Sequence, residues 1–182
     1  TVASTLAIVG ANDKNLGVGR VLNVGVTIFK GKTAYNIWRR GFTADVFSSN
    51  VTWTDSNAFD AYTYDYSGTN AFNNLGTYDK LGNTTTTMNV AYNNAGTTNV
   101  NAGRFTLTGG STSASAFNVA AGAVLDFNYG THNLDAASIT GAGMTEISGS
   151  GSYNFVNLNG GTMGTALRLS GGNLQGTDHT LP

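Results

Sequence analysis

The chain has 182 residues, of which only 10% are charged, and nine basic against ten acidic residues give a formal net charge of −1. This balance offers no electrostatic basis for binding nucleic acid or an anionic membrane surface. The chain has no cysteine and no apolar run of about 18 residues, so we predict neither disulfides nor a segment inserted in a membrane.

The first third of the chain differs in composition from the rest. Residues 1–66 hold six of the nine basic residues and both tryptophans. The alternating apolar residues of 21–29 indicate strands rather than helix. We interpret 1–66 as degenerate or capping coils of a single domain that spans 1–182, because the end coils of a solenoid expose unpaired backbone groups and must be atypical.

Aromatic residues gather toward the end of this first part. Tyr62, Tyr64 and Tyr66 alternate with Thr63 and Asp65, so one face of an extended strand would carry three rings. Such rings either stack on sugars or fill the interior of the fold, and interior packing is the favoured alternative. The candidate glycan contacts are Trp38, Trp53, Tyr62, Tyr64 and Tyr66.

A repeated phrase dominates the remainder. Residues 71–77 read AFNNLGT, and residues 91–97 read AYNNAGT, 20 positions later. Helical repeats are about 33 to 47 residues long, so this period favours a β-solenoid coil. Apolar residues alternate with polar ones in short runs such as 105–107 and 123–127, and no amphipathic helix longer than two turns is evident.

The spacing predicts an all-β, right-handed parallel β-helix-like solenoid with coils of about 19 to 21 residues, in which 67–182 form the regular repeats. Dividing the chain by this period predicts about nine coils. At about 4.8 Å between neighbouring strands, they would form a rod of roughly 40 to 45 Å.

The phrases at 71–80, 84–87 and 92–103 resemble the coil repeats of very large secreted bacterial surface proteins, of the filamentous-haemagglutinin-like and autotransporter-passenger-like kind. The similarity is best over about 67–150. It implies a parallel β-helix that serves in adhesion or as a scaffold at the cell surface. It supplies no catalytic residue.

The carboxylates offer little for catalysis. Enzymes built on parallel β-helices need clustered carboxylates on neighbouring coils, with or without a basic partner. Asp126 and Glu146 are 20 residues apart and could stack about 5 Å from each other, but no basic residue is near them in the sequence. We expect them to be solvated or to cap turns, and we predict no catalytic residue and no enzyme.

Metal and cofactor sites are not predicted either. His132 and His179 lie in polar segments without acidic or cysteine companions at ligand spacing, which argues against zinc. A structural calcium near Asp60 and Asp65 stays open, although no calcium-loop motif is present.

The expected function is a non-enzymatic structural or adhesive module of a bacterial surface protein, extracellular or at the cell surface. Its expected partners are other copies of itself or neighbouring repeats of a longer chain, and surface glycans. One alternative is a self-assembling extracellular filament joined by strand addition, with the segment before residue 33 as donor or acceptor. Another is a carbohydrate-binding or polysaccharide-active β-helix. The ligand, the host and whether the chain is a fragment stay open.

Overall fold

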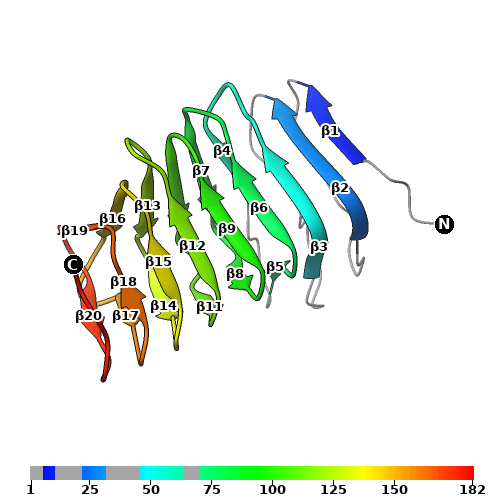
Figure 1. Cartoon of the computed structure of the whole chain (residues 1–182). Coiled ribbons are helices and arrows are strands. Elements are labelled where there is room, and N and C mark those ends of the chain that lie inside the picture. Colours follow the sequence, from blue (N-terminus) through cyan, green and yellow to red (C-terminus); the bar gives the residue numbers. More distant parts are fainter. Residues whose placement is uncertain (1–5, 11–21, 32–45, 64–69) are drawn as a thin grey trace.

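The chain folds as a stack of short parallel strands (Figure 1), seen in a computed structural model that describes residues 6–10, 22–31, 46–63 and 70–182. These residues contain no helix, and hence no helix that could cross a membrane. They form a parallel β-solenoid of about five turns, which confirms the predicted fold class. Trp38, Tyr64, Tyr66 and Asp65 lie outside the described residues.

The described strands, in chain order, are β1 (Leu6–Gly10), β2 (Leu22–Gly31), β3 (Val46–Asp55), β4 (Ala61–Tyr62), β5 (Ala71–Asn74), β6 (Thr77–Lys80), β7 (Thr85–Met88), β8 (Ala91–Asn94), β9 (Thr97–Val100), β10 (Arg104–Leu107), β11 (Ser111–Ser113), β12 (Ala116–Val119), β13 (Val124–Phe127), β14 (Gly130–Asn133), β15 (Ser138–Thr140), β16 (Met144–Ile147), β17 (Asn154–Asn157), β18 (Thr162–Met163), β19 (Ala166–Leu169) and β20 (Asn173–Gln175).

Each regular coil contributes one strand to each of three faces. The first face runs through β5, β8, β11, β14, β17 and β20, the second through β6, β9, β12, β15 and β18, and the third through β4, β7, β10, β13, β16 and β19. The first two faces join at β3, whose residues 46–49 pair with β5 and whose residues 52–55 pair with β6. Strands β1 and β2 continue the same parallel sheet beyond β3.

The repeated phrase is the stacking unit of the fold. Ala71 pairs with Ala91 and Phe72 with Tyr92, in the register that the 20-residue period predicts. The rings of Phe72 and Tyr92 stack with centroids 5.6 Å apart and an interplanar angle of 20°. Ring pairs of this kind stabilise a fold by about 0.5 to 1.5 kcal/mol beyond what the burial of their apolar area contributes. The phrase is therefore repeated because the same interior position recurs in each coil.

The interior also contains amide side chains, at the bend between the first two faces. Asn74 and Asn94 are both buried, and Asn74 Nδ2 donates to Asn94 Oδ1 at 2.8 Å and to the Thr97 carbonyl at 2.9 Å. Asn94 Nδ2 in turn donates to the carbonyl of Ala116 at 3.1 Å. These hydrogen bonds give the Nδ2 groups of both amides partners where the chain bends, which is how a buried polar group is stabilised.

The expected count of about nine coils was made for the whole chain, and the part of the chain that the structure describes makes about five turns. Leu22 pairs with Phe47 and Val46 with Ala71, a spacing of 25 residues in each case, so the first strands take up more chain than a regular coil. The 20-residue period therefore does not extend to the spacing of these first strands.

Candidate functional site

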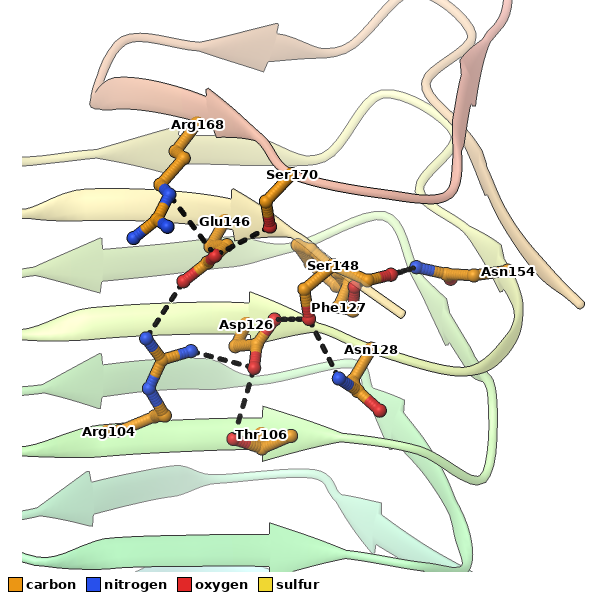
Figure 2. Close-up of polar contacts among 10 residues, drawn as sticks. All are labelled: Arg104, Thr106, Asp126, Phe127, Asn128, Glu146, Ser148, Asn154, Arg168 and Ser170. Carbon is orange, nitrogen blue, oxygen red and sulfur yellow. Dashed lines mark hydrogen bonds and ion pairs between the residues drawn. The ribbon is translucent and has the colours of Figure 1, made fainter. Parts of the chain in front are cut away.

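Four charged side chains of the described C-terminal half meet on the outer surface of the third face (Figure 2). Thr106, Asp126, Glu146 and Arg168 occupy one register column on β10, β13, β16 and β19. Arg104 lies two residues before Thr106 on the same outer side of β10. We call Arg104, Asp126, Glu146 and Arg168 the charge cluster.

Strand alternation places these side chains outside. Phe105 and Leu107 on β10 and Leu125 and Phe127 on β13 are fully buried in the core. Because successive side chains of a strand point to opposite faces, the residues between them point outward. Asp126 is nevertheless almost inaccessible to solvent, since its neighbours cover it.

Arg104 joins both carboxylates. Its Nη1 donates to Asp126 Oδ2 at 2.7 Å and its Nη2 to Glu146 Oε2 at 2.8 Å. The side chain of Arg104 is 33% exposed, while those of Asp126 and Glu146 are 5% and 7% exposed. The planar fork of the guanidinium thus spans two neighbouring strands beyond its own, a geometry that a lysine cannot reproduce.

Hydroxyl groups complete the coordination of the two carboxylates. Ser148 Oγ donates to Asp126 Oδ1 at 2.7 Å and itself accepts from Asn128 Nδ2 at 2.7 Å. Ser170 Oγ donates to Glu146 Oε1 at 2.7 Å, and Arg168 Nε lies 3.4 Å from the same oxygen. All four carboxylate oxygens therefore have a donor within the cluster or beside it.

These contacts favour the charged forms. The hydrogen bonds from Ser170 and then Arg104 lower the pKa of Glu146 against the opposing effect of burial. Burial disfavours the guanidinium of Arg104, but its bonds to Glu146 and Asp126 outweigh that effect and raise its pKa. A general acid needs a proton that it holds near neutral pH. Glu146 is ionised there, so the charge cluster has the properties of an electrostatic clamp across β10, β13, β16 and β19.

A second polar network is sealed inside the first coils. Asp55 Oδ2 accepts from Tyr78 Oη at 2.9 Å and from Thr86 Oγ1 at 2.6 Å, and Asp55 is fully buried. Lys80 is also fully buried and its Nζ donates to the Gly82 carbonyl. Desolvation lowers the pKa of Lys80 despite the nearby carboxylates. No solvent reaches these side chains, so the network stabilises the interior and offers no surface to a ligand.

The two described glycan candidates lie in different environments. Trp53 is 3% exposed and its ring packs edge-on against Phe72 with centroids 5.2 Å apart, so it belongs to the core. The interior alternative therefore applies to Trp53. Tyr62 is 40% exposed at the end of β4. The structure does not bring these two side chains to a common surface.

Asp60 and His132, two of the residues considered for metal binding, have other partners. Asp60 Oδ1 accepts from the backbone N–H of Thr85 at 2.7 Å. His132 is buried, with Nδ1 2.9 Å from Ser111 Oγ and Nε2 3.0 Å from the carbonyl of Tyr129. Among the described residues, no three His, Cys, Asp or Glu side chains gather as a metal site would require.

Two features of the outer surface of the solenoid were not predicted from the sequence. Arg104 is 22 residues from Asp126 and 42 from Glu146, and a search for a basic residue near the carboxylates in the chain does not find it. Counting two coil periods back from Glu146 reaches Thr106, two residues from Arg104 on the same outer side of β10. The second feature is an exposed pair of tyrosines, Tyr129 and Tyr153, whose spacing departs from the 20-residue period.

The chain was compared with known proteins at the levels of family, sequence and structure. No protein-family model matches it, and no match was found among the curated proteins or the solved structures.

Proposed function

We propose that this solenoid is a non-enzymatic adhesive and structural module of a bacterial surface protein and that it acts outside the cell. The observation that carries the proposal is a column of polar side chains on the outside of the first face, one per coil. The column consists of Asn73, Asn93, Thr112, Asn133, Asn157 and Gln175, which follow one another in register.

Neighbouring amides of the column form hydrogen bonds with each other. Asn93 Nδ2 donates to Asn73 Oδ1 at 2.8 Å, and Asn157 Nδ2 donates to Asn133 Oδ1 at 2.8 Å. An amide side chain has two N–H donors and an acceptor oxygen, more than one such hydrogen bond uses. A rigid surface that repeats a weak contact at about 4.8 Å intervals suits multivalent binding, where affinity grows with the number of simultaneous contacts.

The charge cluster supports the non-enzymatic part of the proposal. Both of its carboxylates are committed to donors within the fold, since the oxygens of Asp126 and Glu146 are bound by Arg104, Ser148 and Ser170. The resemblance of residues 67–150 to the coils of secreted bacterial surface proteins supports the location and the adhesive role. Strand addition into filaments stays a prediction.

The proposal is tested by adhesion under flow. Beads coated with the chain are passed over cellulose, chitin and polygalacturonate films, with albumin-coated beads as the reference. We expect retention that rises steeply with coating density and no release of new sugar ends into the buffer. The triple variant Asn93→Ala, Asn133→Ala, Asn157→Ala should lose most of the retention while keeping its strand circular dichroism.

Retention equal to that of albumin on every film would refute the adhesive function. If the parent chain releases reducing or unsaturated sugar ends from a film and Glu146→Gln does not, the proposal that the module is non-enzymatic would be refuted.

A further inference from the structure

Tyr129 and Tyr153 form an exposed aromatic pair on the corner between the third and first faces. Their rings stack with centroids 5.8 Å apart and an interplanar angle of 23°. Tyr129 is 49% and Tyr153 60% exposed, although both are large side chains. Exposed rings held side by side are unusual in a chain that buries Tyr78 and Tyr92 completely.

An insertion brings Tyr153 to this position. The connection from β16 to β17 comprises residues 148–153, whereas the connection one coil earlier comprises only 128–129 and the one after it 170–172. The inserted segment turns back on itself, since the N–H of Tyr153 donates to the Ser150 carbonyl at 3.0 Å. The Tyr153 carbonyl then accepts from the N–H of Gly130 at 2.8 Å, which fixes it beside Tyr129.

The backbone beneath the rings is anchored. The carbonyl of Tyr129 lies 3.0 Å from Nε2 of His132, whose side chain is fully buried. Asn173 Nδ2 donates to the Gly151 carbonyl and holds the inserted segment from the following coil. The two rings therefore stand on fixed supports, and a ligand that stacks on them would need to immobilise little of the protein.

The corners on either side each contain two glycines and one small side chain, Thr108 or Ser170, whose hydroxyl binds Asn89 or Glu146 instead of the pair. In the preceding coil the corner contains Gly109 and Gly110, and in the following coil it contains Gly171 and Gly172. Little side-chain bulk therefore flanks the pair, in line with the exposure of both rings.

The immediate surroundings are polar but uncharged. Residues 128–131 and 148–154 contain Asn, Ser, Thr, Tyr and Gly and no charged residue. The hydroxyl-bearing Ser150 and Ser152 are exposed beside Tyr153. Aromatic faces next to hydroxyl and amide groups match a pyranose ring, which has an apolar C–H face and a rim of hydroxyl groups. The absence of charge in these two connections favours a neutral sugar over an acidic one.

We propose that the Tyr129–Tyr153 pair is a stacking site for the neutral pyranose rings of an external polysaccharide. The proposal gives the adhesive function proposed above a specific ligand class, and it rests on that function for its biological setting. An open corner suits a long polymer that passes across it. A small apolar ligand would need an enclosed pocket to bury most of its surface.

Binding of defined oligosaccharides tests this site directly. Isothermal titration calorimetry is run with cellohexaose and chitohexaose as neutral probes and with hexagalacturonate as the acidic one. We expect the parent chain to bind a neutral hexasaccharide, and Tyr129→Ala and Tyr153→Ala each to weaken it about tenfold through loss of one ring contact. Tyr153→Phe should stay within about twofold of the parent, because the ring face remains.

Leu75→Ala is the matched control. Leu75 is an apolar side chain of similar exposure, 52%, on a different corner of the solenoid, so its loss should leave the affinity unchanged. The site is refuted if the parent binds none of the three probes at millimolar concentration, if it prefers hexagalacturonate, or if both tyrosine variants bind like the parent.

The flow assay separates the proposed stacking site from the proposed adhesive function. Beads that carry Tyr129→Ala and Tyr153→Ala together and are retained like the parent on neutral films would refute the site and leave the adhesive function standing. Tyrosine-dependent binding of free hexasaccharide by a chain whose beads are not retained would support the site and refute the adhesive function.

Discussion

Arg104 and Glu146 bind each other at 2.8 Å although their strands do not pair, because the side chain of Arg104 passes over β13 to reach β16. On its way it also binds Asp126 on β13. One side chain thus links three consecutive coils, and the backbone ladder links only neighbouring ones. The charge cluster should therefore contribute to stability in a way that depends on Arg104 more than on any other member.

We expect Arg104→Met to lower the free energy of unfolding by about 2 kcal/mol. The variant keeps an unbranched apolar side chain but removes the positive charge that Asp126 and Glu146 bind. Removing one partner of a fully buried ion pair costs about 3 to 5 kcal/mol. The cost should be lower here because Arg104 is partly exposed. Urea denaturation at pH 7 measures the loss. Arg168→Met is the control, since Arg168 is 60% exposed and 3.4 Å from Glu146, and it should cost less than about 1 kcal/mol. Equal losses in the two variants would contradict the clamp.

Acid should destabilise the fold through His132. Burial lowers the pKa of His132 from 6.5 to about 4, and the hydrogen bond to the Tyr129 carbonyl only partly opposes this effect. The unfolded chain therefore binds a proton between pH 6.5 and 4 that the native chain does not bind. The contribution is fully present above pH 6.5, and about 3 kcal/mol is lost as the pH falls through that window.

The measurement is the urea midpoint at several values between pH 7 and 4.5, compared between the parent and His132→Gln. The variant has no imidazole to protonate, so its stability should change less over this range even if it is less stable throughout. The lowered pKa of Glu146 adds a loss only below its ordinary value of 4.5. Parallel pH curves for the two chains would show that His132 is not the responsible group.

The sequence predicted the features that recur at a constant period. The alternation of apolar residues identified the interior positions of β10 and β13, and the repeated phrase set the register of Ala71 with Ala91. It did not predict contacts that depend on a long side chain extending past the neighbouring strand or on residues inserted in a corner. Arg104 bridges two coils at once, and Tyr153 meets Tyr129 only because residues 148–153 lengthen one corner. The spacing of the first strands also departs from the constant period, since they lie 25 residues apart.

The neighbouring residues Asn93 and Asn94 should respond very differently to replacement by alanine. Asn94 is buried, accepts from Asn74 Nδ2 and donates to the Ala116 carbonyl. Asn94→Ala removes both of these buried hydrogen bonds and should cost about 2 kcal/mol. Asn93→Ala, on the outer side of the same strand, removes one partly solvated amide contact and should cost about 0.5 kcal/mol. Thermal unfolding of both variants checks the order, and a larger loss for Asn93→Ala would mean that the interior ladder is dispensable.

Gly96, the glycine in the second copy of the repeated phrase, should not tolerate a side chain for a steric reason. A Cβ built on Gly96 would lie 1.9 Å from the carbonyl oxygen of Gly76 in the preceding coil. That oxygen accepts the ladder hydrogen bond from the N–H of Thr97 at 2.7 Å, so the coils would have to separate. We expect Gly96→Ala to cost about 3 kcal/mol or more. In Gly122→Ala, where φ is +80° but no atom lies within 4 Å of the new Cβ, only the left-handed backbone is penalised, by about 1 to 2 kcal/mol. Urea unfolding gives the two values, and circular dichroism reports the strand content if Gly96→Ala does not fold. A Gly96→Ala chain as stable as Gly122→Ala would show that neighbouring coils can move apart without cost.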